Sequence, residues 1–217
     1  MDHLEFPNLG VIKGEIDDNI REYLNSIIDS VLPPNFPEVD LEYNQFPIRD
    51  DEGKLAAFMV PYVNKYFTDF YYPGEPHTTH EHSLEISRLW VRVNHPGDYV
   101  EPHKHKSVLS FVIWMNIPTD WREEQSGNCH ARHPSATDFI LFYSDLLGLI
   151  QTYNVKLDKS SEGTLLLFPG MMDHMVMPGY TSDDYRICIA GDITQSPNVI
   201  NTPHVASNTP QKVDPLV

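Results

Sequence analysis

The sequence predicts a mainly β protein with flanking helices, built as a jelly roll or a barrel. Three observations lead to this fold class. The apolar pattern alternates with a period of two from about Leu84, helical spacing is confined to the first third of the chain, and βαβ alternation does not occur. A chain of 217 residues with 41% hydrophobic content fits one domain. We expect a mostly helical part at 1–83, a jelly-roll core at 84–194, and an extended or disordered tail at 195–217.

Two amphipathic helices are expected before the β part. The first lies in "GEIDDNIREYLNSIIDSVLPP", where apolar residues recur every three or four positions; Asp17 or Asp18 caps its start and Pro33 ends it. The second runs from Leu55 to Phe67, and Pro61 inside it predicts a kink or a break. Each helix offers one apolar face, which suits packing against the outside of a sheet.

The β part begins with "LEISRLWVRVN", whose alternate residues fall on opposite faces of a strand. One face carries apolar Leu89, Val91 and Val93, and the other carries Arg88, Trp90, Arg92 and Asn94. Further strands are expected in "SVLSFVIWMNIP", "TDFILFY", "GTLLLFP" and "YRICIAGDI", which Gly, Pro, Asn and Asp separate. The polar segment at 120–138 reads as a surface insertion, and alternation turns Asn94, Trp114 and Asn116 toward the cavity.

Charge and composition bear on partners and compartment. The formal charge of −16 and the pI near 4.9 argue against nucleic acid or an anionic membrane as partner, since both need a basic face. No signal peptide and no apolar run of about 20 residues is found in the sequence. Two cysteines, Cys129 and Cys188, are too few for a disulfide framework, so we expect a cytoplasmic protein. A homodimer is compatible with these data.

Three of the eleven histidines form a candidate metal site. His103 and His105 are separated by one residue, so both rings project to the same side of an extended segment just before an apolar strand. His174 follows the strand "TLLLF" and a Pro-Gly turn, which places it at a strand end on the rim of the β structure. Neutral imidazoles bind Fe, Zn, Ni and Cu, so the three rings could share one ion.

The other histidines receive no such role. His77, His80 and His82 fall in the polar stretch "PGEPHTTHEHS", for which a solvated loop is the better interpretation than a metal site. Three more lie in expected loops: His130, His133 and His204.

Arg186 indicates an anionic ligand. It lies within the apolar strand "DYRICIAGDI", twelve residues after His174, and its neighbours on the same face, Cys188 and Ala190, are small. An unpaired guanidinium inside a β structure is costly, and a guanidinium is a natural bidentate clamp for a carboxylate. The alternative is that Arg186 points outward and forms a salt bridge. Because Arg186 follows a histidine at this interval, we favour the inward clamp.

The stretches "SRLWVRVNHPGDYVEPHKHKSVLSFVIWMNIPTDW" and "EGTLLLFPGMMDHMVMPGYTSDDYRICIAGDI" resemble the 2-oxoglutarate/iron(II)-dependent oxygenase superfamily. More narrowly, they resemble oxygenases of tailed phages of marine bacteria. The resemblance implies a double-stranded β-helix, cupin-like in shape, with Fe(II) bound at the first motif and at His174. It also implies that Arg186 holds the distal carboxylate of 2-oxoglutarate. We expect Asn94 and Cys188 to contribute to the same co-substrate site, and a phage origin would make the host cytoplasm the compartment.

Two positions depart from the superfamily pattern. The usual first motif is His-x-Asp or His-x-Glu, where this chain has His105, so a carboxylate such as Glu101 or Asp98 is an alternative third ligand. The strand of Arg186 usually offers a hydroxyl two residues later, where this chain has Cys188. The spacing also resembles cupins, whose glutamate after the second histidine is absent. A metal-binding jelly roll without 2-oxoglutarate chemistry, such as a binding or virion component, is therefore the alternative function. The substrate, a small molecule or a protein, is not specified.

Overall fold

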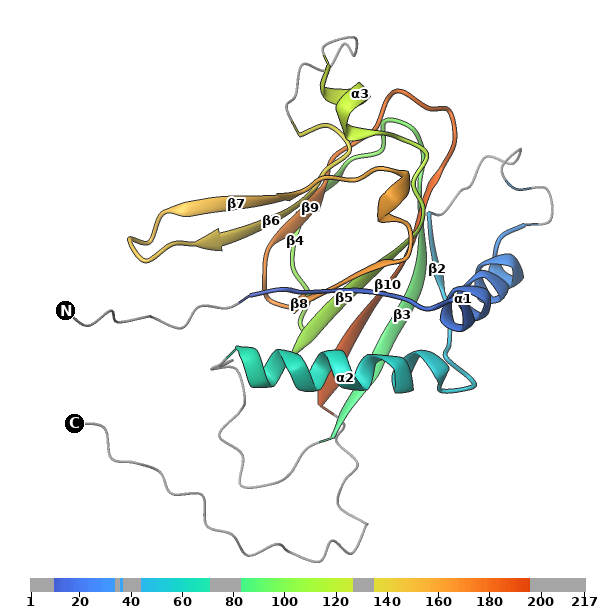
Figure 1. The fold of residues 1–217 in the computed structure, drawn as a ribbon, viewed down its shortest axis with the longest axis vertical. Coiled ribbons are helices and arrows are strands. Elements are labelled where there is room, and N and C mark those ends of the chain that lie inside the picture. Colours follow the sequence, from blue (N-terminus) through green and yellow to red (C-terminus); the bar gives the residue numbers. More distant parts are fainter. Residues whose placement is uncertain (1–9, 34–35, 37–43, 71–82, 127–134, 196–217) are drawn as a thin grey trace, which may run out of the picture.

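Two antiparallel sheets form the core of the molecule (Figure 1). The computed structural model describes residues 10–33, 36, 44–70, 83–126 and 135–195. The larger sheet has six strands in the order β1 (Ile12–Glu15), β8 (Thr164–Pro169), β5 (Leu109–Asn116), β10 (Arg186–Gln195), β3 (Leu84–Asn94) and β2 (Gln45–Pro47). The smaller sheet has the order β4 (Val100–His103), β9 (His174–Val176), β6 (Phe139–Ser144) and β7 (Ile150–Val155). This architecture confirms the mainly β fold with flanking helices, a jelly-roll double-stranded β-helix.

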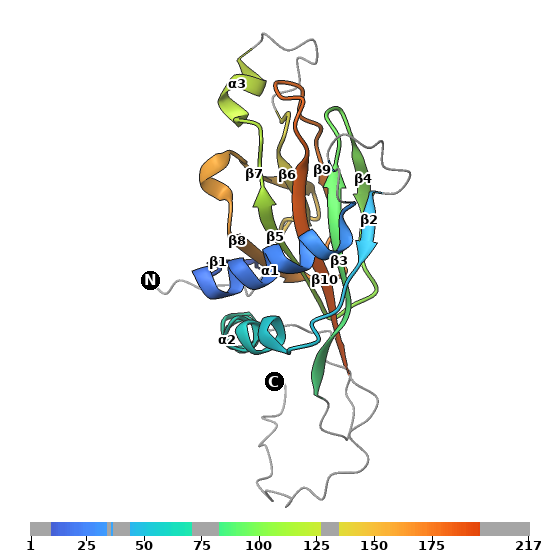
Figure 2. The same ribbon diagram turned by 90° about the vertical axis from the view of Figure 1, so that its right-hand side faces the viewer.

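The two expected helices pack beside the larger sheet (Figure 2). Helix α1 (Asp18–Val31) begins after Asp17, whose side chain accepts a hydrogen bond from the backbone N–H of Ile20 at 2.9 Å. Helix α2 (Lys54–Asp69) runs through Pro61 without a break, which corrects the alternative of a broken helix. Both helices share one apolar core with the larger sheet, because their buried faces join the same cluster of strand residues.

Several elements lie where the sequence did not predict them. Strands β1 and β2 lie in the part that we expected to be mostly helical, and they form the two edges of the larger sheet. The polar segment at 120–138 includes the short helix α3 (Trp121–Gln125), and the 3₁₀ turn η1 (Lys159–Ser161) precedes β8. The expected tail at 195–217 lies almost entirely outside the described residues.

The alternation of β3 separates the core from a pocket. Leu89, Val91 and Val93 are buried in the shared core with α1 and α2. The opposite face of the strand, made of Arg88, Trp90, Arg92 and Asn94, lines a pocket of about 440 Å³. Side chains from both sheets line this pocket, so it lies within the mouth of the jelly roll.

Strand register sets the positions of the residues that the sequence singled out. In the larger sheet, Arg186 of β10 lies opposite Asn94 of β3, and Cys188 lies opposite Arg92. In the smaller sheet, His103 at the end of β4 lies opposite His174 at the start of β9. The helices that the structure describes include none that is long and apolar enough to cross a membrane.

Candidate metal and co-substrate site

The three predicted histidines come together at one end of the pocket. One ring nitrogen of each of His103, His105 and His174 lies within 4.8 Å of those of the other two. The ring centroids are 4.3 Å apart for the pair that faces across β4 and β9, and 5.2 Å apart for each of the other two pairs. In the part of the chain that the structure describes, no aspartate or glutamate joins this group of candidate ligands.

Each of the three rings has its Nδ1 atom engaged by an oxygen. Nδ1 of His103 lies 2.8 Å from the backbone carbonyl of Glu101, and Nδ1 of His174 lies 3.0 Å from the carbonyl of Met172. Nδ1 of His105 lies 2.9 Å from Oδ1 of Asp192. Carbonyl and carboxylate oxygens only accept, so Nδ1 carries the proton in each neutral ring. Nε2 is then the unprotonated nitrogen, which is the arrangement that a histidine ligand requires.

Asp192 is the acidic group of the site, although it is not a candidate ligand. Its side chain is only 4% exposed. Besides the bond from His105, its Oδ1 accepts hydrogen bonds from Ser110 Oγ at 2.8 Å and Ser107 Oγ at 3.3 Å, and Arg88 lies 3.5 Å from Oδ2. Burial raises the pKa of Asp192, but the bonds from His105 and Ser110 and the charge of Arg88 outweigh burial and lower it overall. A buried, ionised carboxylate therefore orients His105 and adds one negative charge behind it.

The surroundings of His174 keep this ring neutral and shielded from water. Burial lowers the pKa of His174 to about 3, so this imidazole is uncharged at neutral pH. The ring of Trp90 stacks on His105 with centroids 5.6 Å apart and an interplanar angle of 9°. On the other side, Phe168 and Phe139 pack against His174 with centroids 5.0 and 5.5 Å apart. Three imidazoles with bonded Nδ1 atoms beside an apolar wall fit a transition-metal ion.

Arg186 lies in the same pocket as the histidines and is 6% exposed. Its Nη1 donates to the backbone carbonyl of Thr137, and its Nη2 donates to the carbonyl of Met177, each at 3.2 Å. Burial lowers the pKa of Arg186 to about 10, which still leaves the guanidinium charged at neutral pH. The two carbonyls fix the side chain, but neither carries a full charge. No carboxylate of the described residues lies within 4.0 Å of the guanidinium. The inward orientation that we expected is therefore observed.

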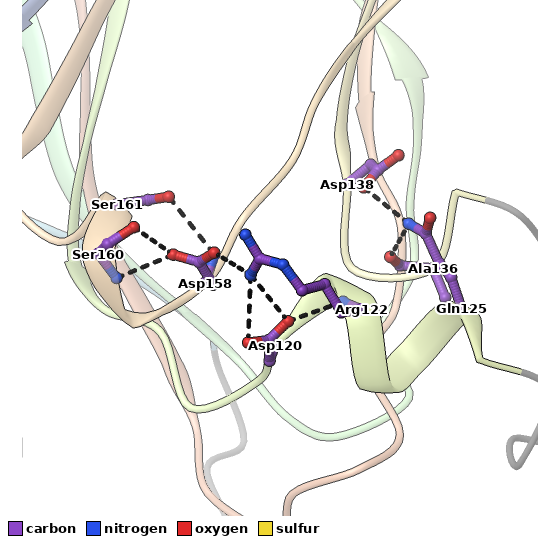
Figure 3. A network of polar contacts seen from close by, with 8 residues as sticks. All are labelled: Asp120, Arg122, Gln125, Ala136, Asp138, Asp158, Ser160 and Ser161. Carbon is purple, nitrogen blue, oxygen red and sulfur yellow. Dashed lines mark hydrogen bonds and ion pairs between the residues drawn. The ribbon is translucent and has the colours of Figure 1, made fainter.

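A polar network holds the segment that receives Arg186 (Figure 3). Thr137 has a positive φ of 63°, and the next residue, Asp138, is completely buried. The carboxylate of Asp138 accepts from Lys156 Nζ at 2.8 Å, from Asn154 Nδ2 at 2.9 Å and from Gln125 Nε2 at 3.2 Å. Figure 3 shows the Gln125 amide directed at both Asp138 and the Ala136 carbonyl. The network fixes the backbone on either side of the Thr137 carbonyl.

The remaining predicted residues have mixed positions. Asn94 and Cys188 line the pocket, and the Nδ2 atom of Asn94 is buried without a hydrogen-bond partner among the described residues. Trp114 also lines the pocket, but Asn116 does not; its Nδ2 donates to the carbonyl of Tyr185 at 2.6 Å, which corrects that expectation. Burial raises the pKa of the Cys188 thiol to about 11, so it is protonated at neutral pH.

The alternative third ligands do not reach the histidines. Glu101 is exposed and contributes only its backbone carbonyl, and Asp98 accepts a hydrogen bond from the backbone N–H of His95 at 2.9 Å. Neither carboxylate belongs to the cluster of candidate ligands in the described chain. The histidines at 77, 80, 82, 130, 133 and 204 lie outside the described residues.

Two contributors were missed by the sequence reasoning, Asp192 and Thr137. Asp192 lies on the same face of its strand as Arg186, three alternations further on, so its position in "YRICIAGDI" was a usable signal. Thr137 acts through its backbone carbonyl, which no residue type reveals.

Comparison with known proteins agrees with this geometry. Residues 88–192, nearly half of the chain, match the family model described as "Putative 2OG-Fe(II) oxygenase". The matched segment includes all three histidines, Arg186 and Asp192. A comparison with curated protein sequences finds no match.

Several solved structures share the fold at low sequence identity. A prolyl-4-hydroxylase from Pseudomonas putida is 13% identical with a TM-score of 0.51, covering 87% of this chain and 94% of that one. An oxidoreductase of the 2OG-Fe(II) oxygenase family from Burkholderia pseudomallei is 10% identical with a TM-score of 0.52, covering 85% and 84%. The non-heme alpha-ketoglutarate-dependent carbocyclase SnoK from nogalamycin biosynthesis is 10% identical with a TM-score of 0.50, covering 85% and 79%. The family model thus matches the segment that carries the histidines and Arg186, and the solved structures share the fold of this chain.

Proposed function

We propose that the protein is an iron(II)- and 2-oxoglutarate-dependent dioxygenase, a hydroxylase, whose iron is held by His103, His105 and His174. Arg186 holds the distal carboxylate of 2-oxoglutarate, with Asn94 and Cys188 beside it. The observation that carries this proposal is the charged, buried guanidinium of Arg186, which lines the same pocket as the three histidines without a carboxylate partner in the described chain.

The histidines fit iron(II) because each presents a ring whose Nδ1 is already engaged by an oxygen, which leaves Nε2 for the ion. When bound, iron(II) with 2-oxoglutarate supplies dioxygen activation coupled to the conversion of the co-substrate to succinate and carbon dioxide. The chain itself orients the ligands: the strand pairing of His103 with His174 fixes two rings, and Asp192 fixes the third. The negative charge of Asp192, which lies behind His105, offsets part of the positive charge of the ion.

Arg186 positions the co-substrate by charge and by hydrogen bonding. A guanidinium has five N–H donors, and the two carbonyl contacts leave three of them for a carboxylate. Across the strand pair, Asn94 offers the buried Nδ2 that has no other acceptor. A carboxylate between these two side chains would satisfy both, which favours a 2-oxoglutarate enzyme over a metal-binding jelly roll without that chemistry.

The apolar wall excludes water from the reacting centre. Trp90 stacks on His105, and Phe139 and Phe168 pack against His174, so apolar rings cover two of the three imidazoles. Exclusion of water strengthens electrostatic interactions inside the site and limits unproductive reaction of the activated centre.

Calorimetric titration of 2-oxoglutarate into the iron(II)-loaded protein under anaerobic conditions tests the proposal. We expect saturable binding of one co-substrate per chain. Arg186→Gln should weaken it by about 1.5–3 kcal/mol, or about 10- to 150-fold, because a charge-assisted contact is lost. Arg49→Gln, an exposed arginine outside the pocket, is the matched control and should change nothing. Absence of binding to the wild type would favour the alternative function; equal binding by the Arg186 variant would remove its assigned role.

Metal analysis tests the ligand set independently. The double variant His103→Ala, His174→Ala should lose the ion, and in a metal-loaded structure the Nε2 atom of His105 should lie about 2.0–2.2 Å from it, the usual length of a histidine–metal bond. An aspartate or glutamate oxygen at that position, with His105 displaced, would restore the ordinary pattern of two histidines and one carboxylate.

The compartment and the origin belong to the same proposal. We infer a cytoplasmic protein, supported by the composition of the chain, which has two cysteines and a formal charge of −16. The resemblance to phage oxygenases supports the cytoplasm of an infected host. Partners other than the substrate are not expected to include nucleic acid or an anionic membrane, since the formal charge is strongly negative.

A further inference from the structure

The pocket has the opposite charge from the rest of the chain. The sequence contains 31 acidic and 15 basic residues, so a random lining would carry about two acids for each base. Among the described residues, the lining instead contains no aspartate or glutamate but five basic residues: Arg88, Arg92, Lys104, Lys106 and Arg186. A concave site with one sign of charge attracts ligands of the other sign.

Arg92 is a basic residue of the pocket that has no carboxylate partner in the described chain and no role toward the co-substrate. It lies on β3, opposite Cys188 of β10 on one side and Gln45 of β2 on the other. Its Nε atom is buried and makes no hydrogen bond, and no carboxylate of the described chain lies within 4.0 Å of the guanidinium. Burial lowers the pKa of Arg92, the expected effect on a cation removed from water. A half-buried guanidinium with an unsatisfied donor calls for an anionic acceptor.

In the proposed function both carboxylates of 2-oxoglutarate already have partners, so the co-substrate does not supply this acceptor. One of them would lie at the iron(II), and Asp192 already has Arg88 at 3.5 Å. The distal carboxylate matches Arg186. Arg92 has no such partner, and its positive charge already repels that of Arg186, whose pKa it lowers. One further anion is needed to neutralise it.

The mouth of the pocket continues the same charge. Lys104 and Lys106 alternate with His103 and His105 along the chain, are exposed, and line the pocket. Neither ammonium lies within 4.0 Å of a carboxylate in the described part of the chain. Exposed lysines at an entrance increase the rate at which anions enter, whereas the buried arginine fixes their position.

We propose that the substrate to be oxidised is a small molecule with a carboxylate or phosphate group, and that Arg92 binds this group. That the ligand is the oxidised substrate rests on the function proposed above; that the pocket binds a second anion does not. The volume of about 440 Å³ is in the range of small-molecule sites, which favours a free acid over a protein segment. The anionic group would lie one strand from Arg186, beside the co-substrate and within the pocket of the histidines.

Titration with two simple anions tests the second site. Inorganic phosphate and propionate, which represent the two candidate groups, are titrated by calorimetry into the protein loaded with nickel(II) and 2-oxoglutarate, and into the metal-free protein. At least one probe should bind at one site per chain after 2-oxoglutarate has saturated, and the better probe identifies the anionic group. Arg92→Gln should weaken that binding about tenfold or more, Arg92→Lys should weaken it less, and Arg49→Gln should leave it unchanged.

Three results would overturn the inference. Binding of neither probe excludes a site for small anions and leaves recognition of a macromolecule. Equal binding by wild type and Arg92→Gln removes Arg92 from the site. Competition between the probe and 2-oxoglutarate, with Arg92→Gln losing as much co-substrate affinity as Arg186→Gln, assigns Arg92 to the co-substrate. If the wild type fails to bind 2-oxoglutarate, the proposed function fails, while the metal-free titration still decides whether Arg92 binds an anion.

Discussion

The buried carboxylate of Asp192 accepts a hydrogen bond from Nδ1 of His105 at 2.9 Å. The acidic residue of the site thus contacts His105, a candidate ligand, and does not itself join the group of candidate ligands. Asp192 comes from β10, whereas His105 follows β4, so the pair joins the two sheets at the mouth of the pocket.

Asp192→Asn should lower metal affinity about 10- to 100-fold, because the amide no longer stabilises the ligating form of His105 by charge. Competition with a chelator of known affinity measures this change. Asp29→Asn, an exposed aspartate on α1, is the matched control. Unchanged metal affinity in the Asp192 variant would show that the bond to His105 does not contribute to ligation.

Asp138→Asn should destabilise the protein by about 1–3 kcal/mol, since Lys156 loses a charged partner and a buried acceptor is weakened. Urea unfolding of the metal-free protein measures the free energy. The Thr137 carbonyl then loses its support, so we also expect weaker 2-oxoglutarate binding. A loss of stability without any loss of co-substrate affinity would show that the network around Asp138 does not help to position Arg186.

Cys188 should react slowly with iodoacetamide at neutral pH, because burial raises its pKa to about 11 and the thiolate is the reactive form. In a Cys129→Ser background, the alkylation rate should rise about tenfold for each pH unit between pH 7 and pH 10. Removing the charge in Arg186→Gln should slow it further, since that guanidinium lowers the pKa of Cys188. A rate that levels off near pH 9 would indicate an ordinary exposed thiol.

Trp90 should report metal binding by fluorescence, because its ring stacks on His105 at 5.6 Å. Paramagnetic nickel(II) bound at the histidines should quench its emission, and Trp90→Phe should remove a large part of the quenching. Trp121→Phe, on α3 and outside the pocket lining, should retain it. Quenching that survives Trp90→Phe in full would place the bound ion elsewhere.

Local patterns in the sequence specify much of this fold and part of this site. The alternation of "LEISRLWVRVN" places Arg92 and Asn94 in the pocket and Val91 in the core, as the structure confirms. The contact between His103 and His174 depends on the pairing of two strands about seventy residues apart in the sequence. Resemblance to a known family can predict this pairing, whereas the periodicity of the sequence cannot. The role of the Thr137 carbonyl is invisible because every residue has one.

The charge of Asp192 also constrains which sequences can occupy this site. His105→Asp would restore the usual His-x-Asp pattern, but it would bring two carboxylates together where a hydrogen bond now exists. Like charges at that range disfavour joint ionisation, so one of them would take up a proton. With Asp192→Asn as a second change, the formal charge of the site is the same as it is now. Positions 105 and 192 should therefore show strong epistasis: either exchange alone impairs the site, and both together preserve it.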